Sequence, residues 1–116
     1  MSKRLIYIAG PLNNYACDYL QNCHKMTVVA EEVRKAGFCV FNPSCDLTAG
    51  LIIGNLSYKD FFDNSQAILE RSDAVFLVSG WGTSEGTKKE IAKATMLGIP
   101  IFEDLEEMKE YFEQEK

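Results

Sequence analysis

The sequence predicts an α/β fold, a three-layer α/β/α sandwich built around a parallel sheet. Two observations predict it. Short, continuous apolar runs end at Gly or Pro, as expected of strands that are buried on both faces. Between these runs lie longer segments with apolar residues at helical spacing, so that strand and helix patterns alternate along the chain. The 116 residues, 47% of them hydrophobic, are expected to form one domain over residues 1–116.

The first strand, helix and second strand are predicted over residues 4–41. Residues 4–10 form an apolar run that is ended by Gly10-Pro11. An amphipathic helix follows over residues 16–36, and its inward positions are Leu20, Cys23, Thr27, Ala30 and Val33. Residues 38–41 form a short second strand, which Asn42-Pro43 ends because proline removes a backbone donor. Together these elements make a βαβ unit.

The middle of the chain predicts a long connection and a second helix. Residues 44–56 contain two glycines and are predicted to form a loop, whose length makes it a candidate substrate flap. Helical periodicity resumes over residues 58–71, and a third buried strand spans residues 73–78. Asp73 at the start of that strand is expected to pair with a nearby Arg or Lys.

The last third of the chain predicts a glycine-rich loop, two helices and a short strand. The loop covers residues 79–87, and the next helix is expected to bury Ile91, Ala94 and Leu97 before it stops at Gly98. A strand over residues 99–102 contains a proline that suits a sheet edge, and Asp104 begins the final helix.

Right-handed crossovers between these elements give a flavodoxin-like or Rossmann-like sheet, for which we expect the strand order 2-1-3-4. Ligands of such sheets bind beyond the carboxyl ends of the strands, where the strand order reverses. Here that point lies between the first and third strands. The turn at Gly10-Pro11 and the loop at residues 79–87 are therefore expected to face one another across the ligand site.

Composition excludes several classes of protein. The net charge is -5 and no run of Lys or Arg forms a stripe, so duplex nucleic acid is not an expected partner. The longest apolar stretches are far shorter than the roughly 20 residues needed to span a bilayer. Residues 1–4 lead directly into a strand pattern rather than a signal peptide, so a cytoplasmic location is expected.

The cysteines do not indicate a metal site or a disulfide framework. None of Cys17, Cys23, Cys39 and Cys45 forms a C-x-x-C pair, although the only histidine, His24, is adjacent to Cys23. In a cytosolic protein, free buried thiols are the expected state, and Cys39 is expected in a core strand. No metal or organic cofactor is predicted.

The loop at residues 79–87 has the features of an anion-binding cradle. Its glycines allow close approach of the backbone, and free amides at the start of the following helix would face a phosphate or ribose. The alternative is a glycine-rich turn in which Ser84 is only an N-cap. Neither nucleotide-binding glycine motif, G-x-x-x-x-G-K-[ST] or G-x-G-x-x-G, is present, so ATP and dinucleotides are not supported.

Glu90 lies one turn into the helix that follows this loop, on the expected ligand side. We expect the helix dipole to favour its ionised form, with a pKa at or below the reference of about 4.3. Such a carboxylate can act as a nucleophile toward an electron-poor anomeric carbon. The alternative is a solvated surface residue, which is the more frequent case for a Glu on a first helical turn.

Two sequence motifs make the chain similar to a known superfamily. The segment YIAGP, from Tyr7 to Pro11, and the pattern GT-x-x-E-x-x-x-A, from Gly86 to Ala94, resemble the paired signatures of the nucleoside 2-deoxyribosyltransferase superfamily. The segments at residues 36–43 and 71–75 also look like those of the family. The resemblance therefore covers nearly the whole chain.

The resemblance implies a role for several residues. Glu90 matches the glutamate that attacks the sugar C1′ and forms a glycosyl-enzyme, which water or a second base then resolves with retention. Tyr7 matches the tyrosine that positions that carboxylate. Ser84 stands where relatives acting on free nucleosides have an aspartate, and where relatives that hydrolyse 5′-monophosphates have a serine for the phosphate. Gly86 and Thr87 would help to hold that phosphate.

One position differs from the family pattern. An acidic residue that helps to handle the base or sugar is usual eight positions before Asp73, and this chain has Ser65 there. Asp63 is the nearest candidate acid, but on a helix an offset of two residues points about 160° away. Either the helix register differs and Asp63 serves, or the leaving group is protonated in another way, or the protein binds without efficient turnover.

Further residues are weaker candidates for the substrate site. Gly10 belongs to the expected rim, Trp81 is expected either to stack a base or to cap the sheet edge, and Asn42 either faces the rim or is a turn residue. The remaining aromatic residues on helices are interpreted as packing residues, namely Phe61, Phe62, Tyr111 and Phe112.

The leading hypothesis is cleavage or transfer at the N-glycosidic bond of (2′-deoxy)nucleosides or nucleoside 5′-monophosphates. One alternative is a phosphoribohydrolase of the cytokinin-activating type, because residues 80–85 loosely resemble that family's glycine-rich loop and acid. Another is a non-catalytic nucleotide-binding or sensing module. The resemblance also implies a small-molecule nucleoside or nucleotide as partner, and a homodimer or higher homo-oligomer whose sites borrow residues from a neighbour.

Overall fold

The computed structural model describes residues 3–11, 16–54 and 57–114 and contains a four-stranded parallel sheet. The strands are β1 (Leu5–Ala9), β2 (Cys39–Phe41), β3 (Ala74–Leu77) and β4 (Ile101–Phe102). Their order is β2-β1-β3-β4, which confirms the predicted fold class and strand order. The reversal between β1 and β3 opens a crevice at the carboxyl ends of these two strands.

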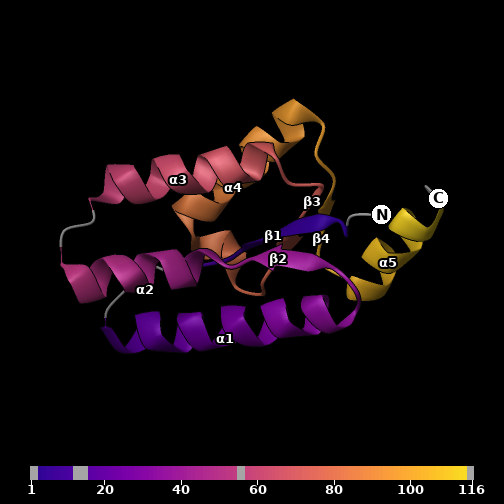
Figure 1. The fold of residues 1–116 in the computed structure, drawn as a ribbon. Helices are drawn as coiled ribbons and strands as arrows, with labels where there is room; N and C mark the ends of the chain where they lie inside the picture. Colours follow the sequence, from indigo (N-terminus) through magenta and orange to yellow (C-terminus); the bar gives the residue numbers. More distant parts are fainter. Residues whose placement is uncertain (1–2, 12–15, 55–56, 115–116) are drawn as a thin grey trace.

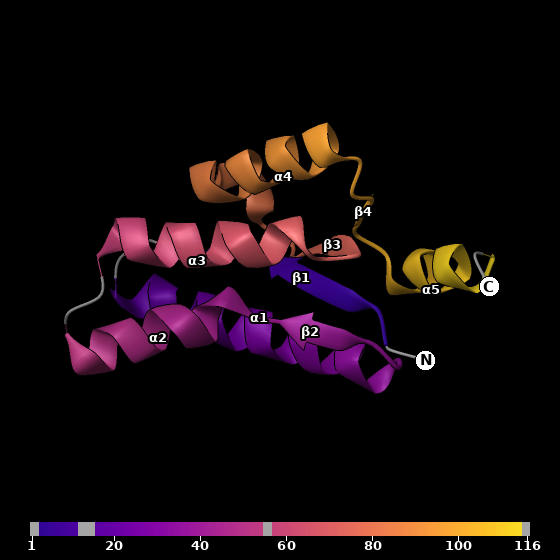
Figure 2. The same ribbon diagram turned by 45° about the horizontal axis from the view of Figure 1, so that its top comes forward.

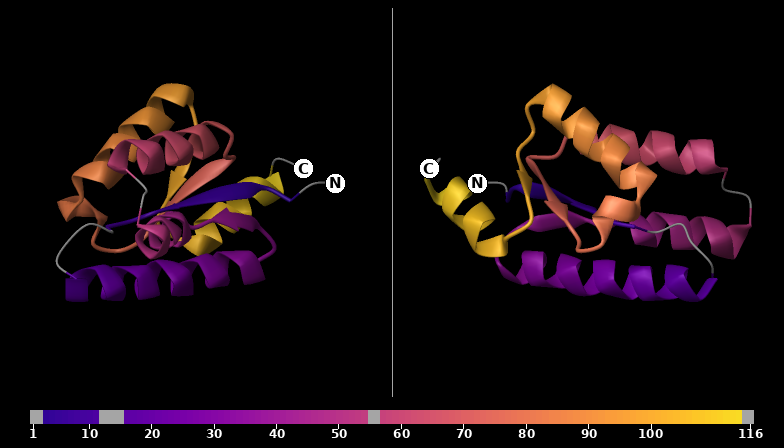
Figure 3. Two further views of the ribbon diagram at one scale, coloured as in Figure 1. Left: turned by 60° about the vertical axis from the view of Figure 1, so that its left-hand side comes forward. Right: turned by 180° about the vertical axis from the view of Figure 1, so that it is seen from behind.

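Helices cover both faces of the sheet, as Figures 1 and 3 show. On one face lie α1 (Ala16–Lys35) and α5 (Leu105–Gln114), and on the other lie α3 (Tyr58–Glu70) and α4 (Glu85–Leu97). Because side chains of a strand alternate between faces, β1 divides its residues between two cores. Ile6 and Ile8 pack with α1 and α5, whereas Tyr7 and Ala9 pack with α3 and α4.

The segment after β2 is a helix, so the predicted loop is wrong over residues 44–53, while residues 55–56 of that prediction lie outside the described residues. The helix α2 (Pro43–Ile53) continues from β2 past the end of the sheet and contacts both α1 and α3 (Figure 2). Asn42 caps it, since its Oδ1 accepts the backbone N–H of Ser44 at 3.0 Å. Pro43 occupies the first helical position, where the missing N–H costs no hydrogen bond. Asn-Pro therefore begins a helix here and also ends the strand.

Several expected core positions are exposed. Leu20 on α1 is 68% exposed and Leu97 on α4 is 50% exposed, because Met26, Ala30 and Val33 face the sheet from α1 and Ala94 from α4. Cys39 is also exposed, since β2 is an edge strand. The side chain of Cys17 lies outside the described residues, and no other cysteine forms a described disulfide.

As the sequence predicted, Asp73 fixes the start of β3. Its carboxylate accepts the backbone N–H of Leu5 at 2.7 Å and lies 3.9 Å from the guanidinium of Arg4. This contact ties the beginnings of β1 and β3 together, so their carboxyl ends also lie side by side.

Within the described segments, no helix combines the length and the apolar character needed to cross a membrane.

Candidate active site

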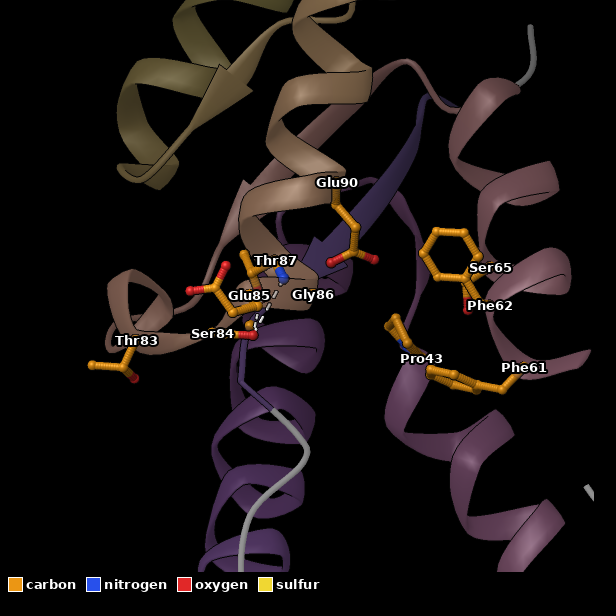
Figure 4. Close-up of a pocket in the computed structure, with 11 residues that line it drawn as sticks. Pro43, Phe61, Phe62, Ser65, Thr83, Ser84, Glu85, Gly86, Thr87 and Glu90 are labelled. Atoms are coloured by element: carbon orange, nitrogen blue, oxygen red, sulfur yellow. Dashed lines mark hydrogen bonds between the residues drawn. The ribbon is translucent and has the colours of Figure 1, made fainter. Parts of the chain in front are cut away.

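A cavity of about 370 Å³ opens at the carboxyl ends of β1 and β3, between α3 and the N-terminal end of α4. Figure 4 shows that its two walls differ in chemistry: polar residues come from the start of α4, and aromatic residues come from α3. The cavity is lined by Gly10, Pro43, Phe61, Phe62, Ser65, Thr83, Ser84, Glu85, Gly86, Thr87 and Glu90. It lies where the strand order predicted a ligand site.

Glu90 lies between these two walls and is held by Tyr7, a residue of β1. The Tyr7 hydroxyl donates a hydrogen bond to Oε2 of Glu90, although the two residues are 83 positions apart in the sequence. Tyr7 itself is fully buried in the middle of the sheet, on the α3 and α4 side. Because its ring is packed inside the core, its hydroxyl fixes the direction of the carboxylate.

The pKa of Glu90 differs from the sequence-based expectation. Burial raises it from 4.5 to about 7, and the hydrogen bond from Tyr7 opposes that rise only in part. The expected value at or below about 4.3 is therefore wrong. A helix dipole contributes about 0.3–1 kcal/mol at an exposed first turn, whereas removing a carboxylate from water costs several kcal/mol. Desolvation outweighs the dipole here.

The polar wall is built around the N-cap of α4. The Oγ of Ser84 accepts the backbone N–H of Thr87 at 3.2 Å and the hydroxyl of Thr87 at 3.0 Å. With both acceptor positions used, the proton of the Ser84 hydroxyl is left to donate to a ligand. Gly86 lies between these two residues in the same turn, where the backbone amides of a helix start attract negative charge. The structure shows the N-cap role of Ser84, and this role leaves the donors of the helix start facing the cavity.

The aromatic wall consists of Phe61 and Phe62 of α3, with Pro43 at the start of α2. The interpretation of both phenylalanines as packing residues alone is incomplete, since Phe61 packs against the core and also lines the cavity. The sequence contained a signal that these phenylalanines could line the cavity. Phe61 and Phe62 lie four and three residues before Ser65, so all three share one helix face.

Asp63 does not reach the cavity, so the suggestion that it serves as the acid is wrong. Its carboxylate is exposed on α3 and accepts a hydrogen bond from Lys59 at 2.6 Å. The helix register places Ser65 at the cavity instead, where its side chain is 3% exposed. Glu85, the only other carboxylate among the lining residues, lies 3.5 Å from Lys88 and is largely exposed.

Two other predicted ligand contacts point elsewhere. The Trp81 indole donates its N–H to Glu103 at 2.5 Å and packs beside the sheet core, so it is not among the lining residues. Asn42 is occupied as the cap of α2 and also donates to Thr27 at 3.3 Å. Neither residue lines the cavity: Trp81 packs against the sheet core, and Asn42 caps α2 instead of acting only as a turn residue.

Gly10 lies at the end of β1, where the chain passes close to the next strand. A Cβ at this position would lie 2.9 Å from the Cβ of Val78. Glycine is therefore required for β1 to continue past β3 and form the edge of the cavity. Among the described residues, no cluster of His, Cys, Asp and Glu side chains is arranged to hold a metal ion.

Comparison with known proteins agrees with the observed fold. The 2-deoxyribosyltransferase of the psychrotolerant bacterium Bacillus psychrosaccharolyticus, described as a biocatalyst for the synthesis of antiviral and antitumoral nucleosides, has a similar structure. The TM-score is 0.59 at 25% sequence identity, over 84% of this chain and 69% of that one. No curated protein matches the sequence significantly.

The structural likeness supports a place in the nucleoside 2-deoxyribosyltransferase superfamily without defining the individual member. The domain of unknown function DUF4406 matches residues 4–103, which include the whole sheet and every residue that lines the cavity. The chain therefore belongs to the DUF4406 family.

Proposed function

We propose that this protein cleaves or transfers at the N-glycosidic bond of (2′-deoxy)nucleosides or their 5′-monophosphates, with Glu90 as nucleophile. The observation that carries the proposal is the half-buried Glu90 carboxylate, oriented by Tyr7 in a cavity of about 370 Å³. Cavities of roughly 300–1,000 Å³ are typical for small-molecule ligands. The similar 2-deoxyribosyltransferase structure supports the same class of reaction.

The proposed chemistry needs one carboxylate oxygen to face the sugar. Tyr7 holds Oε2 of Glu90, so Oε1 is left to attack the anomeric carbon. The bond from that carbon to the base nitrogen breaks, and its electrons leave with the base, which takes up a proton. The resulting glycosyl ester is then attacked by water or a second base, and the Glu90 carboxylate leaves. Two displacements at the same carbon retain its configuration.

The two walls suggest how a substrate lies. A pentose above Glu90 would direct its 5′ group toward Ser84 and Gly86, and its base toward Phe61 and Phe62. The aromatic rings offer stacking surfaces to any base. The start of α4 offers donors to a phosphate, and the Ser84 proton is one of them.

Base release measured by chromatography tests the proposal. The protein is incubated with deoxynucleosides, ribonucleosides and their 5′-monophosphates, with and without a second base as acceptor. We expect release with at least one substrate, and a loss of at least about 1,000-fold in Glu90→Gln, since removing a nucleophile eliminates the covalent route. Glu113→Gln, which changes an exposed glutamate on α5, is the matched control. Release that persists in Glu90→Gln would refute the assignment.

The choice between nucleoside and monophosphate depends on Ser84, and Ser84→Asp separates the two. Aspartate is as good an N-cap as serine and can still accept from Thr87, so the helix start is retained. Its negative charge repels a phosphate but not a free 5′ hydroxyl. We expect the variant to lose kcat/KM for monophosphates by at least about tenfold while activity on nucleosides is kept.

A second function, a non-catalytic nucleotide-binding module, is favoured by one observation. The cavity wall from α3 carries no carboxylate, because Ser65 faces the cavity and Asp63 faces solvent. Leaving-group protonation would then fall to solvent or to the exposed Glu85. Thermal stabilisation by nucleotides, without base release under any condition above, would support this function over the enzyme.

A further inference from the structure

Ser65 presents a hydroxyl with no described partner to the cavity. The residue is 3% exposed, and its Oγ lacks a hydrogen-bond partner among the described residues. Buried hydroxyls are almost always bonded, because an unpaired one loses its hydration without compensation. An unpaired hydroxyl inside a ligand cavity indicates a group that is satisfied when the ligand is present.

Other buried serines of the chain show that this state is unusual. The Oγ of Ser72 donates to the carbonyl of Ile68, four residues earlier, at 2.8 Å. The Oγ of Ser44 donates to Asn42 at 2.7 Å. Ser65 has a helical carbonyl four residues before it in α3, and serines in helices often bond to that carbonyl. Its hydroxyl makes no such bond and lies at the cavity instead.

The neighbours of Ser65 indicate the ligand chemistry. Phe61 and Phe62, one turn earlier on the same face of α3, supply flat apolar surface, and Glu90 lies across the cavity. A planar heteroaromatic ring stacked on those side chains would bring one polar edge to the hydroxyl. We propose that Ser65 is a specificity-determining residue, whose hydroxyl hydrogen-bonds the polar edge of the nucleobase. This inference rests on the proposed function and names the base contact within it.

A serine at this position accepts more bases than a charged residue would. A hydroxyl both donates and accepts, so it pairs with a keto oxygen, a ring nitrogen or an amino group. A carboxylate would only accept and would exclude keto edges. The site is therefore expected to accept several bases, provided that each carries a hydrogen-bonding edge.

Binding to Ser65→Ala tests the inference, measured by calorimetry in a Glu90→Gln background so that no substrate is consumed. The probes are 2′-deoxyadenosine 5′-monophosphate and its indole analogue, which has a similar shape but no hydrogen-bonding edge. We expect the variant to bind the adenine nucleotide about five- to tenfold more weakly. Its affinity for the indole analogue should be unchanged.

The ligand-free protein gives an independent result. Because Ser65→Ala removes an unpaired buried hydroxyl, its Tm should rise by about 4 °C. Ser72→Ala is the matched control: it removes a bonded buried hydroxyl outside the cavity, so its Tm should fall and its affinity for both probes should stay the same.

The outcomes separate this inference from the proposed function. Equal losses for both probes, no loss for either, or a lower Tm in Ser65→Ala would overturn the role of Ser65 and leave Glu90-dependent base release untouched. Nucleotide binding that needs the Ser65 hydroxyl, with no base release by the unmodified protein, would uphold the inference while the catalytic proposal fails. Absence of binding to any nucleoside or nucleotide would overturn both.

Discussion

The half-buried carboxylate of Glu90 predicts an unusual dependence of stability on pH. Burial raises its pKa from 4.5 to about 7, so the folded protein keeps a proton that the unfolded chain loses in this range. Glu90→Gln removes the titration. It retains an oxygen that can accept the hydrogen bond from Tyr7 and has nearly the same shape. The variant therefore isolates the cost of charging this one group inside the protein.

The sign and size follow from proton linkage. Below pH 4.5 the carboxyl is neutral in both states, so its stabilising contribution is fully present. As the pH rises from 4.5 to about 7, the unfolded chain ionises and the folded protein does not, so stability is lost. Above that range the loss is complete. A pKa difference of this size corresponds to about 3 kcal/mol of the free energy of unfolding.

Urea denaturation at pH 4.5, 6, 7 and 8.5 measures this effect directly. We expect Glu90→Gln to gain stability relative to the unmodified protein with rising pH, by about 3 kcal/mol between the two extremes. Glu113→Gln, which alters an exposed glutamate, controls for the change in net charge and should stay within about 0.5 kcal/mol of the unmodified protein at every pH.

A constant difference between Glu90→Gln and the unmodified protein across this range would refute the reasoning. It would mean that Glu90 ionises as it does in the unfolded chain, and hence that water reaches it freely. A gain toward low pH would contradict the argument more strongly, because it would require a stabilised carboxylate. Either result would remove the physical basis for treating Glu90 as a desolvated nucleophile.

Three further predictions follow from the site and its supports. Tyr7→Phe removes the hydrogen bond that lowers the pKa of Glu90, so kcat should fall and the acidic limb of the kcat/KM profile should move to higher pH; an unchanged profile would contradict this. Gly10→Ala places a Cβ 2.9 Å from the Cβ of Val78 and should cost about 1–3 kcal/mol in urea denaturation, whereas Gly82→Ala, with no atom within 4 Å of its Cβ, should cost much less. Asp63→Asn should leave base release unchanged because its carboxylate faces solvent; a loss above about tenfold would restore Asp63 as the acid.

The strands were predictable because strand and helix patterns alternate along the chain. In such a chain, a continuous apolar run of four to six residues fits few elements other than a buried strand. The helix α2 was not predicted, although its signals are local. Asn42 and Pro43 were interpreted as the end of a strand, but asparagine followed by proline also begins a helix. The two functions share the same residues, so the sequence alone did not separate them.

The shift in the pKa of Glu90 was predicted in the wrong direction. The helix dipole depends on local sequence, whereas desolvation depends on residues that are distant in the sequence. The helix dipole depends on position within α4, which can be inferred from the sequence around Ser84. Desolvation depends on Tyr7, which comes from a strand 83 residues away, and on the surrounding walls from other elements. No local pattern reports how much water remains around a carboxylate.

The sequence by itself determined the sheet, its strand order and the edge at which Glu90, Tyr7 and Ser84 meet, because hydrophobic periodicity and crossover handedness are properties of the chain. Only the tertiary structure decided which side of α3 faces the cavity. That choice brought Ser65 and the phenylalanines inward and turned Asp63 to solvent. A helix side chain points into a cavity or into water according to how its helix is rotated against its neighbours, and packing sets that rotation.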